Sequence, residues 1–358
     1  MLELASIFLG IVPMVVFALL MWRIDHWETE PFPLVVGAFF WGAIPSVFFY
    51  SFSQIILTSP LEVLGISQEE SFFATFYAAG ILAPLTEEFA KGFGVLLVFV
   101  IYRKHMHSIL DGIIYGSIVG FGFAGVENIF YFMSQKDWGS LWSLFQLRAY
   151  YFGLNHAIFT SATGIGMALC LFTKTPKMRF FWPLFGLAAA MFLHFMHNLL
   201  CTVEEFSKTG FAGGLAVLSN NNLEFWFGTL ILYCLYREYI WISIQLDDEV
   251  RVGILTARQA NDAANFFKRS SLWALSVGLP NMLARKRLLK AATKLAYAKQ
   301  HCQMRSQSFS ANKNIQKLRI LVKELSEKDP LIASRRDKEF EPKPPPLPPI
   351  RRMPPPLP

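Results

Sequence analysis

Two adjacent glutamates and a lysine interrupt a long apolar stretch of the sequence. The segment LTEEFAKGF places Glu87, Glu88 and Lys91 inside a run that is otherwise long enough to cross a membrane. A charged side chain at the centre of a bilayer costs roughly 2.5 to 3.5 kcal/mol on insertion scales, so such residues usually face the interior of a helix bundle and mark a functional site. On a helix, Glu87 and Lys91 share one face at i and i+4 and can form an ion pair.

Polar side chains also interrupt three later apolar segments. They are Glu127 and Asn128 in GFAGVENIFY, His156 in LNHAIFT, and His194, His197 and Asn198 in LHFMHN. Counted from the expected cytoplasmic ends of their segments, Glu87, Glu127, His156 and His194 lie 14 to 17 residues deep. At about 1.5 Å per residue this depth is roughly 21 to 26 Å in a core about 30 Å thick. We therefore expect four helices to bring these side chains to one level in the outer half of the bilayer.

Two acids, two histidines and an asparagine in a partly dry pocket are suited to proton transfer to and from water. Glu87 is the candidate base, and Glu88 or Glu127 would be the second acid, held in a different protonation state by its environment. His194 and Asn198, one helical turn apart, are candidates to stabilise an oxyanion on an attacked carbonyl. The chemistry predicted from the residues is therefore hydrolysis by an activated water molecule.

Two assignments stay open at this level. His197 neighbours Asn198 and is an alternative to His194, although the i,i+4 spacing favours His194. Arg148 is expected just before the fifth span, where an arginine commonly extends to the interface. It could equally pair with Glu88 or Glu127, or hold a substrate carbonyl or carboxylate.

The composition defines the elements that must position these residues. Of 358 residues, 53% are hydrophobic and only 16% are charged, which excludes an ordinary soluble domain. We predict an all-α, polytopic bundle of about seven transmembrane helices with a basic helical cytoplasmic tail. The predicted spans are Leu4–Trp22, Phe32–Leu57, Ser71–Tyr102, Ile109–Phe132, Tyr150–Phe172, Phe180–Cys201 and Leu223–Ile244. The third is over-long and contains Pro84, so a tilt, a kink or a split into two half-helices is expected.

Charge is distributed unevenly along the chain. Residues 1–244 contain 11 Lys and Arg against 16 Asp and Glu, whereas residues 245–358 contain 22 against 10. Basic residues in alternate loops and in the tail predict a cytoplasmic C-terminus and an external N-terminus in a plasma-membrane protein. The first apolar segment is expected to be a retained span, because no basic region precedes it and no cleavage pattern ends it. The four cysteines show no paired spacing and are expected to be packing residues.

Three regions are predicted: a membrane core over residues 1–244, a basic helical tail over 245–340 and a proline-rich end over 341–358. The cationic stretch ARKRLLKAATKLAYAK suits the anionic inner leaflet, and a solvated helix is the alternative. The PxxP spacings of the end are compatible with a partner that binds proline-rich motifs, and a plain tether is the alternative. No nucleic-acid partner is expected. Within the core, Gly112, Gly116, Gly120 and Ala124 form a small-residue stripe that permits close helix packing.

The quoted motifs, in this order on successive helices, resemble those of the PrsW family of intramembrane proteases. They are EEFAK (Glu87, Glu88, Lys91), GFAGVEN (Phe123, Glu127, Asn128), HAIFT (His156) and HFMHN (His194, Asn198). That family is related to the type II CAAX prenyl endopeptidases and to the multispanning scaffold subunit of gamma-secretase. The resemblance covers about residues 1 to 244, and the tail lies beyond it.

The resemblance implies cleavage of a peptide bond within or beside the membrane by a glutamate-activated water, with no obligatory metal and no cofactor. It implies that Glu87 is the general base, Glu88 the supporting acid, and His194 with Asn198 the oxyanion site. Some relatives make the first cut in regulated proteolysis of a membrane-bound anti-sigma factor on the outer side. The substrate expected here is therefore a membrane protein or a small peptide.

Two other functions stay open from the sequence. The polar cluster could tie helices together in a non-catalytic scaffold or a proton-linked sensor, as in the gamma-secretase relative. Glu and His are also ligands for zinc or iron, so a metal site or a metal transporter is a second alternative. Neither HExxH nor a Glu-x-x-His spacing is present in the expected spans. The spacing of the residues therefore does not support a metal site.

Overall fold

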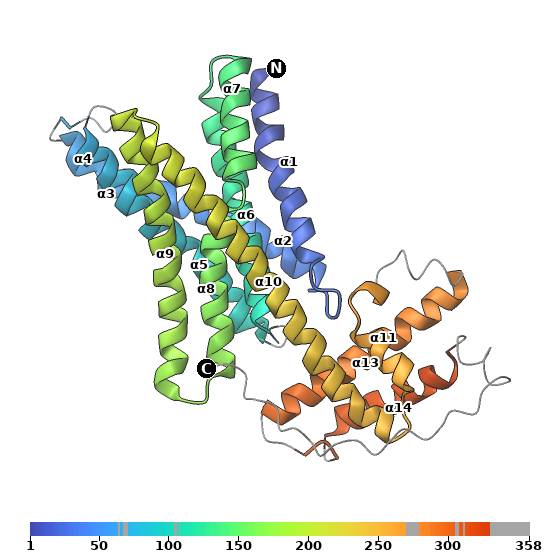
Figure 1. The fold of residues 1–358 in the computed structure, drawn as a ribbon. Coiled ribbons are helices and arrows are strands. Elements are labelled where there is room, and N and C mark those ends of the chain that lie inside the picture. The colour runs from blue at the N-terminus through green and yellow to red at the C-terminus, as the bar shows by residue number, and fades with distance from the viewer. Residues whose placement is uncertain are drawn as a thin grey trace. The chain divides into compact units, whose positions relative to one another are not determined.

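The computed structural model shows a helical protein. It describes residues 1–63, 65–66, 71–103, 106, 108–269, 279–304, 308–310 and 312–329. All of the regular elements among these residues are helices, so the predicted all-α class is confirmed (Figure 1). The proline-rich end, 341–358, and the last part of the predicted tail lie outside the described residues.

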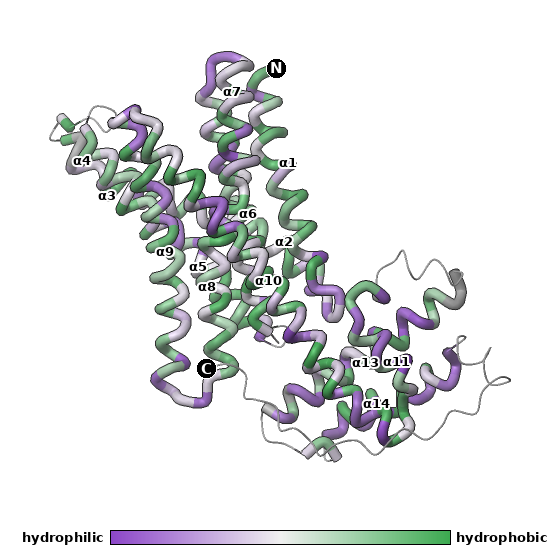
Figure 2. Tube along the Cα trace, in the orientation of Figure 1, coloured by the Kyte–Doolittle hydropathy of each residue, from purple (hydrophilic) through white to green (hydrophobic). Residues whose placement is uncertain are grey.

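The chain forms two compact units. Unit 1 consists of Met1–Ile24 and Glu30–Leu232, and unit 2 consists of Asp25–Thr29 and the chain from Tyr233 onward. The division falls inside one long helix, whereas the sequence analysis placed it after residue 244. Unit 1 helices are mostly hydrophobic along their length, while those of unit 2 carry many hydrophilic positions (Figure 2).

Unit 1 contains long apolar helices joined by short connections. Its elements are α1 (Leu2–Trp22), α2 (Phe32–Trp41), η1 (Gly42–Ser46), α3 (Val47–Val63), α4 (Phe72–Thr75), η2 (Phe76–Leu82), α5 (Ala83–Ile101), α6 (Ile109–Met133), α7 (Trp138–Phe145), η4 (Gln146–Tyr151), α8 (Asn155–Phe172), α9 (Pro176–Ser207) and the first part of α10 (Phe211–Arg251). In Figure 1, α1, α6, α8 and α9 run along similar directions, and the continuous helix from α2 to α3 is inclined to them.

Five helical stretches are long and apolar enough to cross a membrane: Leu2–Trp22, Phe32–Pro60, Ile109–Met133, Trp138–Phe172 and Pro176–Ser207. The protein is thus a multi-pass membrane protein, and the count of seven spans stays a prediction for α5 and α10. One boundary differs from the sequence analysis. The predicted span Tyr150–Phe172 corresponds to the longer stretch Trp138–Phe172, so Arg148 lies within this stretch and not just before it.

Three π-helical segments interrupt these helices, and two of them have a clear cause. Pro45 lies within η1, and Pro84 lies two residues after the end of η2, in the first turn of α5. Proline has no backbone N–H to donate to the residue four positions earlier, so the preceding turn widens. The predicted irregularity of the third span is therefore a π-helical segment before Pro84 rather than a split into separate helices. π-helical turns often occur at functional sites.

The glycine stripe of α6 brings two site helices into backbone contact. A Cβ on Gly116 would overlap Thr160 and Ser161 of α8, and a Cβ on Gly120 would overlap the His156 carbonyl. Only glycine permits this approach, which confirms the predicted close packing. The contact at Gly120 fixes His156 beside α6.

Unit 2 packs around its own apolar core. Its helices are the last part of α10, α11 (Ala257–Ala264), α13 (Leu279–Met304) and α14 (Lys313–Glu327), with a short 3-10 turn, η5 (Phe267–Arg269). Trp27, from the loop between α1 and α2, is buried in this core and donates its indole N–H to the Ala264 carbonyl at 2.8 Å. That loop and the tail fold together, which requires them to lie on the same side of the membrane. The tail is helical where it is described, as predicted.

Candidate active site

The two glutamates and the lysine of α5 form one buried ion cluster. Glu87 is 1% exposed, and Glu88 and Lys91 are 0% exposed. The Lys91 ammonium lies 2.5 Å from Glu88 Oε1 and 3.3 Å from Glu87 Oε2. It also lies 4.3 Å from the centre of the Phe123 ring, which adds a cation–π contact. The i,i+4 pair of Glu87 and Lys91 predicted from the sequence is present, and the lysine also pairs with Glu88.

His156 of α8 connects this cluster to Glu127 of α6. Its Nδ1 lies 3.1 Å from Lys91 Nζ, and its Nε2 lies 2.9 Å from Glu127 Oε2. An ammonium group only donates hydrogen bonds, so Nδ1 accepts and Nε2–H donates to Glu127. His156 therefore has both nitrogens engaged, and Glu127 joins the cluster through it.

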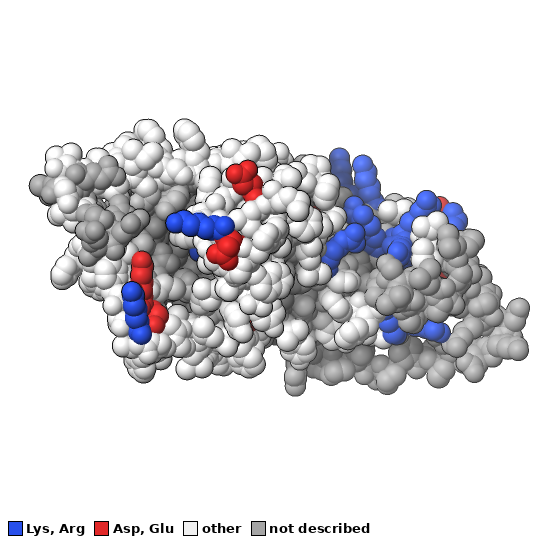
Figure 3. Space-filling view, turned by 90° about the horizontal axis from the view of Figure 1, so that it is seen from above, with Lys and Arg blue, Asp and Glu red and all other residues white. Residues whose placement is uncertain are grey.

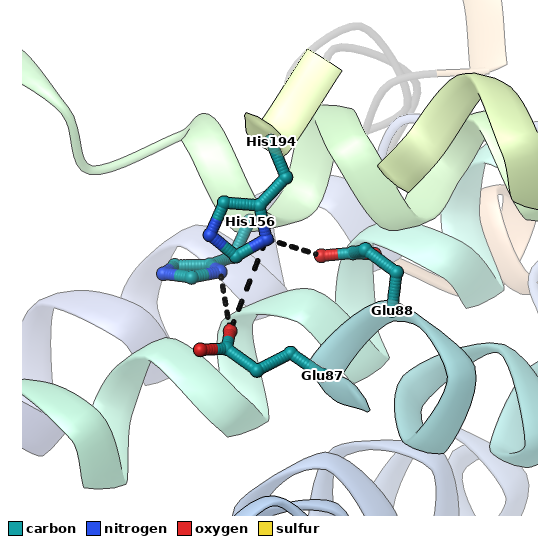
Figure 4. Close-up of side chains that lie close together, drawn as sticks. All are labelled: Glu87, Glu88, His156 and His194. Carbon is teal, nitrogen blue, oxygen red and sulfur yellow. Dashed lines mark hydrogen bonds and ion pairs between the residues drawn. The ribbon is translucent and has the colours of Figure 1, made fainter. Parts of the chain in front are cut away.

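His194 of α9 completes the set from a fourth helix. Its Nδ1 lies 3.0 Å from Glu88 Oε1 and 3.9 Å from Glu87 Oε2. Figure 4 shows the His194 ring directed at both carboxylates of α5 and the His156 ring directed at Glu87. Because a carboxylate accepts, Nδ1–H donates to Glu88, and Nε2 of the neutral ring is an acceptor. The predicted convergence of Glu87, Glu127, His156 and His194 is present.

The structure separates His194 from His197. The His197 ring belongs to a second group, with Nδ1 at 3.3 Å from Asn155 Nδ2 and Nε2 at 3.7 Å from Cys201 Sγ. Asn198 donates from Nδ2 to the Ala79 carbonyl in η2 at 2.8 Å, which ties α9 to the π-helical segment. His194 is thus the histidine of the glutamate cluster, and one amide hydrogen of Asn198 is already committed to the backbone.

Arg148 pairs with Glu127 and not with Glu88. Its Nη2 lies 2.6 Å from Glu127 Oε2, and its Nε donates to Asn128 Oδ1 at 2.9 Å. The guanidinium also stacks over the Tyr131 ring, 3.8 Å from its centre. These contacts follow from the position of Arg148 within η4, inside the pass. Of the alternatives that the sequence left open for Arg148, the pair with Glu127 is therefore present.

Other contacts of the cluster come from residues that the sequence analysis did not single out. Thr160 donates to Glu88 Oε2 at 3.0 Å, and Tyr50 of α3 packs edge-on against Phe123. Thr160 is four residues after His156 within the HAIFT motif, so helical spacing could have identified it. Tyr50 had no such signal, because its helix carries no other residue of the cluster.

A cavity of about 110 Å³ opens on one side of the cluster, which is room for several water molecules. Glu87, Glu127, Arg148, His194 and Asn198 all contribute to its lining, as does His156. Glu88 and Lys91 do not line it. Among the carboxyl groups of α5, Glu87 therefore faces the cavity and Glu88 lies behind it.

The three carboxyl groups share two permanent cations. Glu88 holds Lys91 at 2.5 Å and Glu127 holds Arg148 at 2.6 Å. Glu87 has only the shared lysine at 3.3 Å. Of the two cluster carboxyl groups that line the cavity, Glu87 is thus the one without a cation of its own.

The cluster also contains ligand types for a metal ion. Glu87, Glu88, His156 and His194 each offer one donor atom, and these atoms lie within 4.8 Å of one another. The Lys91 ammonium, however, lies within 3.3 Å of the Glu87, Glu88 and His156 donor atoms. It takes the lone pairs that a metal would use, and its charge would repel a second cation. The arrangement around Lys91 therefore does not fit a metal ion.

Comparison with known proteins identifies the family of the chain. The sequence model of the family described as "PrsW family intramembrane metalloprotease" matches residues 30–221. The chain is 28% identical over 210 residues to Protease PrsW of Geobacillus kaustophilus (strain HTA426), covering 59% of this chain and 84% of that protein. It is 35% identical over 127 residues to Protease PrsW of Bacillus subtilis (strain 168), covering 36% and 53%. For Protease PrsW of Clostridioides difficile (strain 630) the identity is 30% over 128 residues, covering 36% and 50%.

No solved structure shows a significant similarity to the chain. The family match includes more than half of the residues and the whole ion cluster from Glu87 to Asn198. With four helices contributing the motif residues to one buried site, the chain belongs to the PrsW family of intramembrane proteases.

Proposed function

We propose that this intramembrane protease hydrolyses a peptide bond of a membrane protein with Glu87 as the general base. The main support for the proposal is the way in which the carboxyl groups of the cluster are paired with cations. Glu87 lines the cavity and lacks a cation of its own, whereas Glu88 and Glu127 each hold one. A carboxylate that is buried but incompletely paired accepts a proton from water more readily than one held by a close ammonium or guanidinium.

The proposed reaction begins with a water molecule in the cavity beside Glu87. Glu87 takes one proton as the water oxygen attacks the substrate carbonyl. The negative charge on the carbonyl oxygen is stabilised by the second amide hydrogen of Asn198 and by His194, whose Nε2 is an acceptor in the neutral ring and must first take a proton from water in the cavity in order to donate. Glu87 then returns the proton to the leaving nitrogen as the peptide bond breaks.

Three further residues position the groups that take part in this step: Glu88, Lys91 and His156. Glu88 orients His194 through the Nδ1 hydrogen bond, and Lys91 supplies the positive charge between the two α5 carboxylates. His156 links Lys91 to Glu127, whose partner Arg148 also faces the cavity. We propose Arg148 as a contact for a substrate carbonyl.

The family description contains the word metalloprotease, and we propose a metal-independent reaction for this chain. Support comes from Lys91, whose ammonium stands among the donor atoms that a metal would need. Replacing Lys91 by alanine should leave those donors free, so the variant should bind zinc with higher affinity than the wild type while losing activity. Metal analysis of both purified proteins after zinc loading and dialysis tests this. Stoichiometric zinc in active wild-type protein would contradict it.

The substrate class is also a proposal. The resemblance implies a membrane-bound protein such as an anti-sigma factor, cut on the outer side of the plasma membrane, with the C-terminus of the protease in the cytoplasm. We further propose that the tail contacts anionic lipid. On α13, Lys286, Arg287, Lys290 and Lys294 are exposed. Lys and Arg side chains gather on one face of the region formed by unit 2 (Figure 3).

The experiment that tests the proposal compares new protein N-termini in membranes of cells that contain wild-type protein or Glu87→Gln at matched levels. The proposal expects specific termini to disappear in the variant. Those termini identify the substrates and the side of the membrane on which they are cut. If both proteins accumulate equally and no terminus differs under several stress conditions, the cluster acts as a scaffold or sensor instead.

A further inference from the structure

Tyr50 brings a fifth helix to the catalytic cavity. It belongs to α3, whereas the acids and histidines of the cluster come from α5, α6, α8 and α9. Its side chain lines the cavity together with Glu87 and Asn198. A phenol hydroxyl both donates and accepts hydrogen bonds, and the hydrolysis proposed for this site gives Tyr50 no role so far.

Contacts with two other helices hold α3 in place beside the cluster. A Cβ on Gly42, in the turn that precedes α3, would overlap the backbone of α6 at Val119, so this turn packs directly on α6. In the same continuous helix, Trp41 donates its indole N–H to the Ala90 carbonyl of α5 at 3.0 Å. The backbone that carries Tyr50 is therefore fixed against the helices of Glu87 and its neighbours.

The Tyr50 ring packs against the buried part of the cluster. Its centre lies 5.9 Å from that of Phe123 in an edge-on arrangement. Phe123 is fully buried, and its ring centre lies 4.3 Å from Lys91 Nζ. Tyr131 also lines the cavity, but it lies under the Arg148 guanidinium and is 46% exposed. Tyr50 is thus the tyrosine on the Lys91 side of the cavity.

The Tyr50 hydroxyl is free to contact a bound molecule. None of the described residues forms a hydrogen bond with it. Its oxygen is also not one of the described buried atoms that lack both a partner and accessible surface. The oxygen therefore keeps accessible surface on a side chain that lines the cavity. A substrate group that enters the cavity can supply the missing partner.

Of the two residues assigned to the oxyanion, only one offers a hydrogen at once. Asn198 has one amide hydrogen left, because the other is donated to the Ala79 carbonyl. His194 donates from Nδ1 to Glu88, and its Nε2 is an acceptor until the ring takes up a proton. Oxyanion sites combine several donors that are in place before the reaction begins. The Tyr50 hydroxyl would be a second such donor, since it needs no prior proton uptake.

We propose that Tyr50 is a catalytic residue whose hydroxyl donates a hydrogen bond to the substrate oxyanion. When water attacks, the carbonyl double bond becomes a C–O⁻ single bond, and Tyr50 and Asn198 bind this oxygen from α3 and α9. The phenol keeps its proton, so the only proton transfers remain those of the hydrolysis itself. Because the hydrogen bond strengthens as the charge develops, it lowers the barrier rather than tightening substrate binding. The assignment rests on the proposed function of Glu87.

Tyr50→Phe removes only the hydroxyl and keeps the ring against Phe123. With a substrate found by the N-terminal comparison, we expect kcat to fall about 10²-fold and KM to change by less than about twofold, since loss of one oxyanion donor typically costs 10² to 10³ in kcat. Tyr150→Phe is the matched control, because Tyr150 is 77% exposed and does not line the cavity. An unchanged kcat, or a raised KM at unchanged kcat, overturns the proposal.

Binding measurements on the purified full-length protein separate this role from a structural one. One probe is the substrate peptide itself, measured in the Glu87→Gln background, where it stays uncleaved. The other is a difluoroketone analogue of the same peptide, which forms a tetrahedral hydrate similar to the reaction intermediate. Tyr50→Phe should weaken binding of the analogue by about tenfold or more and leave the affinity for the substrate peptide unchanged. Equal losses for both probes, or no loss for the analogue, overturn the proposal.

The same experiments distinguish failure of this assignment from failure of the proposed function. If Glu87→Gln cleaves as fast as the wild type, the proposed function fails and the role of Tyr50 fails with it. If Glu87→Gln abolishes cleavage and Tyr50→Phe cleaves normally, only the assignment of Tyr50 is overturned.

Discussion

Both units of the protein bury clusters of charged side chains, and the clusters differ in how completely their charges are paired. In unit 2, Asp262 pairs with Arg285 and, at 2.5 Å, with Lys268, and Asp329 lies 3.1 Å from Arg285. In the same unit, Glu249 lies 3.0 Å from Lys299 and 2.8 Å from Arg319. These acids each have at least one permanent cation.

In unit 1, by contrast, three carboxyl groups share Lys91 and Arg148, and the incompletely paired one faces a cavity. Buried ion pairs alone are thus weak evidence of a catalytic site, because they occur in both units. The informative feature is an acid that lacks its own cation and is accessible to water. The difference separates an active cluster from a structural one and can be tested by substitution.

The largest effect is expected for Glu87→Gln. Loss of a general base typically reduces the rate by about 10² to 10⁴, and the substitution preserves size and removes no dedicated ion pair. Cleavage should therefore be lost while the protein accumulates normally. Cleavage of a substrate found by the N-terminal comparison is the measurement, and Glu205→Gln, at an exposed position of α9, is the control. A Glu87→Gln protein that fails to accumulate would assign the cluster a structural role.

Glu249→Ala in unit 2 should show the opposite pattern. It leaves Lys299 and Arg319 without their shared acid, and breaking a buried ion pair costs roughly 3 to 5 kcal/mol. Thermal unfolding should reveal this loss, while cleavage per folded molecule should be unchanged. The exposed Glu327→Ala on α14 controls for removal of a surface charge. Lost cleavage in a stable Glu249→Ala protein would mean that the two clusters do not differ as described.

Gly120→Leu tests whether the backbone contact between α6 and α8 positions the active cluster. The added side chain would overlap the His156 backbone, and overpacking of this kind costs about 1 to 3 kcal/mol. Both stability and cleavage should fall. Gly37→Leu is the matched control, because a Cβ at Gly37 meets no atom within 4 Å. Equal effects of the two substitutions would show that the close approach is not required.

The smallest effect is expected for Asp137, the N-cap of α7. Hydrogen bonds from Ser140 and Gly139 lower the pKa of this carboxyl below its ordinary value. Its contribution to stability is therefore present at pH values above the ordinary pKa and is lost as the pH falls through the lowered one. The difference in unfolding temperature between wild type and Asp137→Ala should be small at pH 7 and should shrink on acidification. A difference that grows at low pH would be inconsistent with this cap.

The glycine stripe, the i,i+4 spacing of Glu87 with Lys91 and the order of the motifs were all readable in the sequence, because helical periodicity fixes which residues share a face. Counting residues along each predicted span also indicated that four of the site residues lie at a similar depth in the membrane. The start of the fifth span was missed, since the segment before Tyr150 is less apolar. The sequence left an interfacial position and pairing with Glu88 or Glu127 open for Arg148, and the structure shows the pair with Glu127.

The sequence by itself determined the membrane class, the helical architecture and the residue types of the site, since each depends on composition or on spacing along one helix. Only the tertiary structure decided how the charges are shared. Distances between side chains decide whether Lys91 lies closer to Glu88 or to Glu87 and whether His194 or His197 contacts the acids. Packing between different helices decides which carboxyl groups line the cavity.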